Sequence, residues 1–199
     1  VYLMRIIMNQ EPLGVAPDIV LPQDLVRWSD LNSAHHLTDY SATGETKHNT
    51  SPFPYDAEIN HKIILWSGDI TSLQVDAIVN STNESMSDNN PVSNRIFQRA
   101  GSELKEEISL DVRECRTGEV RVTQGYALPA RYIIHTVGPK YNIKYQSASE
   151  STLHTCYRSV LQKAKEMGLH SIALSVVNSV KRNFPPDVGA HIALLDVST

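Results

Sequence analysis

GDITSLQVDAIVNSTNE, residues 68–84, is the stretch of this chain that decides the fold. The apolar run 63–66 precedes it, so the chain turns at Gly68 with the carboxylate of Asp69 at the end of a predicted strand. A second apolar run, 77–79, has polar residues on both sides, which is typical of a buried strand that opens into a loop. Ligands of open α/β sheets bind just beyond the carboxyl ends of strands. The stretch therefore predicts a buried strand followed by a candidate ligand-binding loop.

Two side-chain amides, those of Asn80 and Asn83, are predicted to lie just past the carboxyl end of this second strand. An amide both donates and accepts hydrogen bonds, so either residue can bind the diol of a sugar. The same residues can instead close an Asx turn. Their spacing leaves both interpretations open.

Helical and strand patterns alternate along the rest of the domain. Apolar spacing predicts one helix over 96–108, with Ser93 as its N-cap, and a second helix over 153–167, ended by Gly168. Further strands are predicted over 119–123, 132–137 and 171–177. This alternation indicates an α/β fold with a mixed, largely parallel central sheet covered on both faces. His135 lies inside an apolar run, so we interpret it as a core histidine.

The first 60 residues differ in composition from the rest of the 199. They hold three Lys and Arg residues against eight Asp and Glu residues, and five of the ten prolines. We therefore predict an acidic, proline-containing, mostly irregular tail over 1–55 and a folded domain over 56–199, cut short in its last helix. The domain is close to neutral, which excludes proteins that bind nucleic acid through a globally basic surface.

The two cysteines, Cys115 and Cys156, are far apart and lack metal-ligand spacing. We therefore expect buried, unreactive thiols, no metal, no cofactor, and a reducing compartment, the cytoplasm. The apolar start, residues 1–7, is too short for a secretory signal or a membrane span, so we expect no membrane contact from this chain.

Three motifs, GDIT, VDAIVNSTNE and TGEVRVTQGYALPARYIIHTVGP, resemble the macro domain family of ADP-ribose-recognising modules. The resemblance runs from about residue 63 to residue 191 and implies a three-layer α/β/α macro domain. It also implies residue roles. Asp69 would accept a hydrogen bond from the adenine amine, and Ile70 would add a backbone N–H. Asn83 would contact the far ribose, whereas Asn80 would brace the loop.

The resemblance also implies that the ligand's diphosphate rests on two glycine-rich loops, where no Cβ obstructs the backbone N–H groups. In this chain the first loop, 85–93, contains no glycine, and it carries Pro91, which lacks an N–H, and the carboxylate of Asp88. The second loop, 178–185, has Val180 and Asn183 where the family has glycines. We therefore expect weakened diphosphate binding. The other candidate contacts in these loops are Val92, Ser93, Ser179, Lys181, Arg182 and Phe184.

Catalysis is disfavoured by one position. Family members that hydrolyse ADP-ribosyl esters carry an aspartate after the first loop, and Ser93 occupies the matching position here. A neutral serine is a poor general base. The resemblance therefore favours a catalytically silent domain over an ADP-ribosyl hydrolase.

Three functions remain in competition. The first is a binding module for an adenine-containing ligand, either ADP-ribose-like or poly(A). The second is a scaffold that binds no nucleotide and serves protein contacts, and the third, disfavoured, is a hydrolase. A poly(A) strand needs a basic path for its phosphates, which Lys140, Lys144, Lys181 and Arg182 can supply, although they are equally consistent with solvated side chains. No protein partner is indicated.

Overall fold

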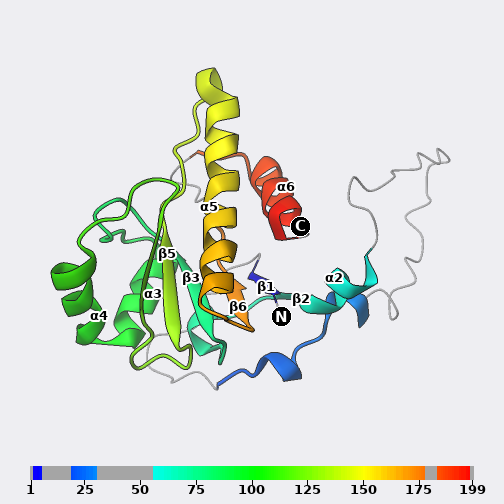
Figure 1. Cartoon of the computed structure of the whole chain (residues 1–199), viewed down its shortest axis with the longest axis horizontal. Helices are drawn as coiled ribbons and strands as arrows, with labels where there is room; N and C mark the ends of the chain where they lie inside the picture. The colour runs from blue at the N-terminus through cyan, green and yellow to red at the C-terminus, as the bar shows by residue number, and fades with distance from the viewer. Residues whose placement is uncertain (1, 6–18, 31–55, 178–182, 198–199) are drawn as a thin grey trace.

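A computed structural model describes the chain at residues 2–5, 19–30, 56–177 and 183–197 (Figure 1). Its centre is a six-stranded sheet in which every neighbouring pair is parallel except the β4–β5 pair at one edge. The predicted mixed, largely parallel sheet is therefore confirmed. In spatial order the strands are β2 (Ile63–Trp66), β1 (Tyr2–Arg5), β6 (Ile172–Leu174), β3 (Ala77–Ser81), β5 (Tyr132–Thr136) and β4 (Val120–Gln124).

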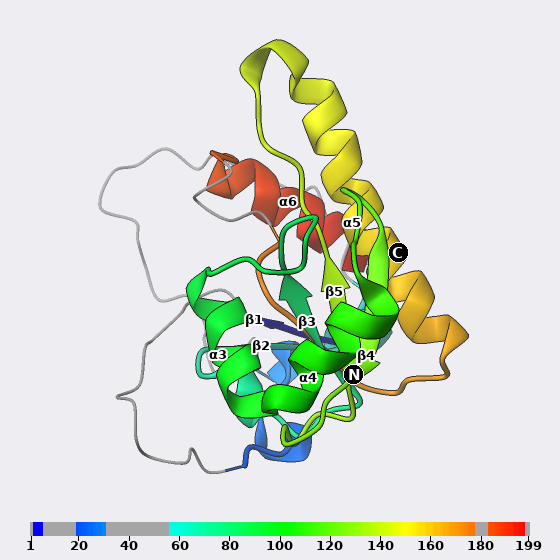
Figure 2. The ribbon, with the colours of Figure 1, turned by 90° about the vertical axis from the view of Figure 1, so that its left-hand side faces the viewer.

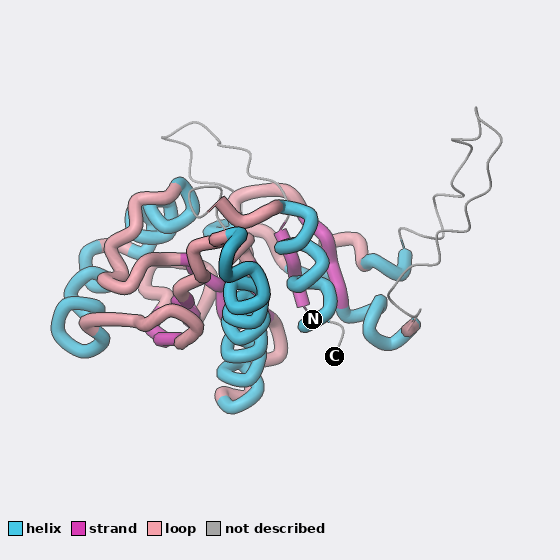
Figure 3. Tube along the Cα trace, turned by 90° about the horizontal axis from the view of Figure 1, so that it is seen from above, coloured by secondary structure: helices cyan, strands magenta, loops and turns pink. Residues whose placement is uncertain are grey.

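Helices cover both faces of the sheet, because successive strand side chains point to opposite sides. In β3, Ile78 packs with the helices α3 and α4, whereas Ala77 and Val79 pack with α5 and α6. Figures 1 and 2 show α5 beside α6, with α3 and α4 across the sheet. Figure 3 looks along α5. The predicted three-layer α/β/α fold is confirmed. The four helices are α3 (Pro91–Ala100), α4 (Ser102–Glu107), α5 (Gln146–Glu166) and α6 (Pro186–Val197).

Two details of the first predicted helix were wrong. It is not continuous over 96–108, because Gly101, with a φ of 96°, separates α3 from α4, and a π-helical turn, η3 (Ile108–Val112), follows. Its N-cap is Asn90, whose side chain accepts a hydrogen bond from the N–H of Ser93 at 2.9 Å. The end of the second helix is as predicted, since Gly168 follows α5 with a φ of 64°.

The predicted tail over 1–55 contributes to the folded domain, which we did not foresee. Strand β1 pairs with β2 on one side and β6 on the other. The backbone of Val20 also bonds to Ser72 and Gln74. These pairings join residues far apart in sequence, so no local pattern reveals them. The tail residues 1, 6–18 and 31–55 lie outside the described residues.

Short helical turns complete the described structure, and within it no helix is long and apolar enough to cross a membrane. The helix α2 starts at its N-cap Asp56, whose side chain accepts from the N–H of Ile59. The turns are η1 (Pro22–Asp24), α2 (Ala57–Lys62), η2 (Ile70–Ser72) and η4 (Ile143–Tyr145).

Candidate functional site

The loops after three parallel strands meet at the carboxyl edge of the sheet. The Ser81 hydroxyl, at the end of β3, donates to the carbonyl of Val177, beyond β6, at 3.0 Å. Gly138, beyond β5, lies so close that a Cβ there would stand 2.7 Å from the same carbonyl. This edge is where ligands of such sheets bind.

The close approach at Gly138 gives a testable prediction. Gly138→Ala should destabilise the protein by about 1–3 kcal/mol, because the new methyl must push the 177 carbonyl away. Chemical denaturation would measure the loss. Gly168→Ala is the matched control, since a Cβ at that position meets no atom within 4 Å and adds only the strain of a positive φ, about 1–2 kcal/mol. Unchanged stability in Gly138→Ala would contradict the close approach.

Asp69 stands at the predicted edge, but it is already engaged by the protein. Its Oδ1 accepts from the N–H of Thr71 at 2.9 Å and from the Thr71 hydroxyl at 2.6 Å, and its Oδ2 accepts from Arg95 Nε at 2.8 Å. Burial raises the pKa of Asp69, but the hydrogen bonds from Thr71 and Arg95 outweigh it and hold the pKa below its ordinary value. The carboxylate is therefore ionised and paired. The side chain of the neighbouring Ile70 is buried in the core.

Sequence reasoning missed Arg95 and, one turn later on α3, Arg99. The available signal was their spacing of four residues, which places both on one face of a helix. Their target could not be read from sequence, because Asp69 follows β2 while α3 follows β3.

The side chain of Asn83 closes a turn, which is one of the two roles that its spacing left open. Its Oδ1 accepts from the N–H of Ser87 at 2.8 Å and from the hydroxyl of Ser85 at 3.2 Å, so the side chain closes a turn. Among the described residues its amide nitrogen has no acceptor. That donor can still bind a ribose hydroxyl.

The glycine-free first loop is held in shape by its own side chains. Met86 adopts a φ of 55° without being glycine, and its side chain is buried. The carboxylate of Asp88 accepts from the N–H of Asn90 at 3.1 Å and from the Asn90 amide at 3.2 Å. The same amide donates to the carbonyl of Ser81 at 2.8 Å. The Asp88 carboxylate therefore accepts from a backbone N–H at the start of α3. Val92, the second residue of that helix, is half-buried.

A buried polar chain lies behind this loop. Asn80 Nδ2 contacts Ser93 Oγ at 3.3 Å and His135 Nδ1 at 3.2 Å, and His135 Nε2 contacts Thr123 Oγ1 at 2.9 Å. Burial lowers the pKa of His135 to about 3, so the imidazole is neutral, as a core histidine should be. The position of Asn80 fits a bracing role. Its Oδ1 has no partner among the described residues.

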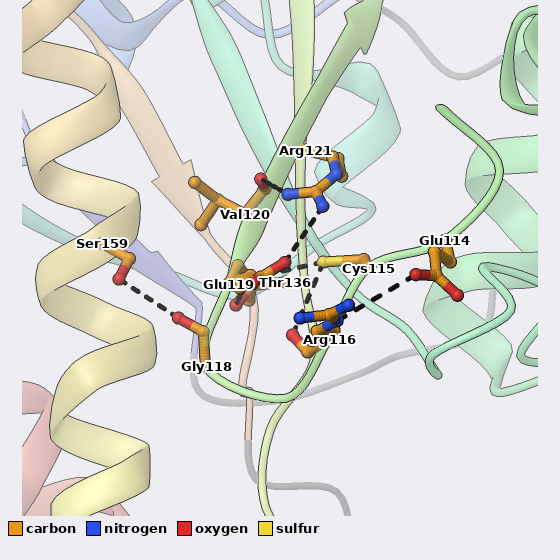
Figure 4. Close-up of polar contacts among 9 residues, drawn as sticks. All are labelled: Glu114, Cys115, Arg116, Gly118, Glu119, Val120, Arg121, Thr136 and Ser159. Atoms are coloured by element: carbon orange, nitrogen blue, oxygen red, sulfur yellow. Dashed lines mark hydrogen bonds and ion pairs between the residues drawn. The ribbon is translucent and has the colours of Figure 1, made fainter. Parts of the chain in front are cut away.

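The loop that precedes β4 is joined by hydrogen bonds to β5 and α5 (Figure 4). The N–H of Cys115 donates to the carbonyl of Glu84 at 2.9 Å. The hydroxyl of Thr136, at the end of β5, donates to the carbonyl of Glu119 at 3.0 Å, and Ser159 on α5 donates to Gly118. Burial raises the pKa of the Cys115 thiol to about 11, so it is protonated and a poor nucleophile. The expectation that Cys115 is buried is confirmed.

The second loop, 178–185, is described only at residues 183–185. Ser179, Val180, Lys181 and Arg182 lie outside the described residues. Asn183 is exposed with a φ of 54°. Phe184 is buried and meets the ring of Tyr141 edge-on, with ring centroids 5.0 Å apart. Its side chain therefore belongs to the core. Within the described ranges no three His, Cys, Asp or Glu side chains are placed to hold a metal ion.

Comparison with known proteins identifies this arrangement. The Macro domain family matches residues 79–193. A protein GDAP2 homolog from Drosophila melanogaster is 52% identical over 158 residues, which cover 79% of this chain and 29% of that protein. The crystal structure of the ganglioside induced differentiation associated protein 2 (GDAP2) macro domain has a TM-score of 0.79 and 43% identity, over 92% of this chain and 81% of that one.

A Trypanosoma brucei macrodomain in complex with ADP matches with a TM-score of 0.70 and 32% identity, over 91% of this chain and 64% of that one. The chain spans about a third of the length of the curated relatives it matches, from 29% of the Drosophila melanogaster protein to 38% of the Homo sapiens protein. The resemblance seen in the motifs at 68–84 and 117–139 is confirmed. This chain belongs to the macro domain family.

Proposed function

We propose that this domain is a catalytically silent binding module for an adenine-containing ligand. Family membership and the ADP bound by the Trypanosoma brucei relative support a nucleotide ligand. Asp69, an ionised carboxylate at the carboxyl edge of the sheet, supports recognition of the adenine amine, since each carboxylate oxygen has more than one lone pair. The amide nitrogen of Asn83 supports contact with the ribose.

The observation that carries the proposal is the position of Asp88. Its carboxylate holds the Asn90 N–H at the start of α3, where a helix would otherwise offer backbone donors to a phosphate. A diphosphate at this point would meet a like charge, which costs about 1–4 kcal/mol depending on the dielectric. The domain is therefore expected to prefer ligands whose recognition depends on adenine more than on a diphosphate.

Catalytic silence is supported by the surroundings of Ser93. Its side chain is buried, its hydroxyl contacts Asn80 and its N–H donates to Asn90. Neither neighbour is a base that could activate the hydroxyl or a water. We therefore expect no ADP-ribosyl hydrolysis.

Replacing one acid in the first loop tests the ligand preference. Asp88→Asn removes the charge but keeps an oxygen for the Asn90 N–H, so affinity for ADP-ribose should rise roughly tenfold while affinity for adenosine stays constant. Isothermal titration with ADP-ribose, adenosine and an adenine oligonucleotide measures each affinity. Asp111 is an exposed acid on η3, so Asp111→Asn serves as the control and should change the affinity for none of the three ligands.

The titrations also separate the competing functions. Submicromolar ADP-ribose binding by the unchanged protein would contradict the expectation that diphosphate binding is weakened. If none of the three ligands binds, the binding-module function is excluded and the scaffold function is favoured. Release of ADP-ribose from a mono-ADP-ribosylated substrate would contradict catalytic silence.

A further inference from the structure

Two arginines converge on a single carboxylate beside the predicted adenine contact. Arg95 Nε lies 2.8 Å from Asp69 Oδ2, and the Arg99 guanidinium lies 3.9 Å from the same oxygen. Arg99 also donates to the hydroxyl of Thr71 at 2.8 Å, and that hydroxyl in turn bonds to Asp69. The cluster therefore contains two positive charges and one negative charge.

The positive charges are largely withdrawn from water. The side chains of Arg95 and Arg99 are only 19% and 20% exposed. Like charges four residues apart on a helix repel each other, and removing a guanidinium from water costs more. Burial lowers the pKa of Arg99, and although Asp69 raises it, the charge of Arg95 lowers it further. One carboxylate therefore does not fully compensate the pair.

Unused hydrogen-bond donors remain on both guanidinium groups. Arg95 binds Asp69 through Nε, and Arg99 binds Thr71 through one terminal nitrogen. Among the described residues, both terminal nitrogens of Arg95 and two of the three nitrogens of Arg99 have no acceptor. A guanidinium presents its donors as a planar fork that matches the oxygens of a phosphate. The residual positive charge and the free N–H donors of the two guanidinium groups both favour binding of an oxyanion.

We propose that Arg95 and Arg99 form a phosphate site next to Asp69, separate from the altered diphosphate loops. The ligand class is an adenine nucleotide that carries an additional phosphate on the 2′ or 3′ oxygen of its adenosine ribose, such as an adenosine bisphosphate. The identification of the nucleoside rests on the proposed function, because it assumes that adenine meets Asp69. The phosphate site itself does not depend on that assumption.

Side-chain NMR tests the phosphate site directly. The Nε–H signals of Arg95 and Arg99, assigned with Arg95→Lys and Arg99→Lys, should shift on titration with inorganic phosphate and stay in place with sodium chloride at equal ionic strength. The Nε–H signal of Arg121, which lies on β4 and is paired with Glu119, is an internal control and should not move. Equal responses to phosphate and chloride would overturn the site.

Nucleotide titrations identify the source of the phosphate. Adenosine 3′,5′-bisphosphate or its 2′,5′ isomer should bind at least tenfold more tightly than adenosine 5′-monophosphate, since a charge-assisted pair is expected to contribute an order of magnitude or more. Arg99→Gln should remove that advantage, and Arg121→Gln should retain it. Arg99 rather than Arg95 is replaced because Arg95 is hydrogen-bonded to Asp69 and Arg99 is not.

The outcomes distinguish the two proposals. If the arginine signals respond to phosphate but adenosine and its monophosphate do not bind, the proposed adenine function fails and the phosphate site stands. If adenosine binds but a second phosphate adds no affinity and the arginine signals are unmoved, the phosphate site fails and the adenine function stands.

Discussion

Below pH 6.5 the protein is expected to lose about 1.4 kcal/mol of stability for each pH unit on account of His135 alone. Above that pH the imidazole is neutral in both the folded and unfolded chains, so it contributes no pH dependence. Between pH 6.5 and the folded pKa of about 3, His135 is protonated in the unfolded chain and neutral in the folded chain. The unfolded state is therefore favoured progressively as the pH falls, by about 4–5 kcal/mol across the window.

The comparison variant is His135→Gln, whose amide can accept from Asn80 and donate to Thr123 without titrating. Urea denaturation of both proteins between pH 7.5 and 4.5 gives two curves of unfolding free energy against pH. All other acids and bases are common to the two proteins, so their difference should have a slope of about 1.4 kcal/mol per pH unit. Parallel curves would show that His135 takes up a proton in the native state.

Asp69→Ala is expected to destabilise the fold by about 3–5 kcal/mol, because it leaves Arg95 and Arg99 partly buried with no counter-charge. The variant also loses the cap of η2, since the carboxylate accepts from the N–H of Thr71. Denaturation by urea measures the total loss. Any effect of this variant on adenine binding must therefore be measured on the folded fraction.

A double-mutant cycle isolates the ion-pair contribution to that loss. Asp69→Ala combined with Arg95→Ala should be less damaging than the sum of the two single changes, because each single change leaves one member of the pair unpaired. Arg121→Ala is the matched arginine control, since Glu119 holds Arg121 at a site remote from η2. Additive losses in the Asp69 and Arg95 cycle would mean that the two side chains do not interact appreciably.

Much of the fold follows from local patterns in the sequence. The apolar runs at 77–79 and 132–137 mark β3 and β5, and the positive φ after α5 matches the glycine at 168. Strand β1 was not foreseen, because it has only four residues and both of its partners are distant in sequence. The break between α3 and α4 was also missed, since a single glycine inside an apolar period does not reveal its φ.

The candidate site was only partly predictable for the same reason. The sequence placed Asp69 at the end of one strand and Asn80 and Asn83 just past the end of another, which is wrong for Asn80, because it lies within β3. Their partners did not follow from the sequence, because Arg95 reaches Asp69 from a helix that starts after a different strand, and His135 contacts Asn80 from the neighbouring strand β5. Long-range side-chain pairing depends on strand order, which a single sequence does not supply.

The place of β1 within the sheet also constrains the order in which the chain can assemble. Tyr2 is made before both of its strand neighbours, Ile63 and Ile172, which are distant from it in the sequence. The nascent chain must therefore leave β1 unpaired on its β6 side until β6 has also left the ribosome. Such remote pairings slow folding and prolong the exposure of unpaired strand edges to aggregation.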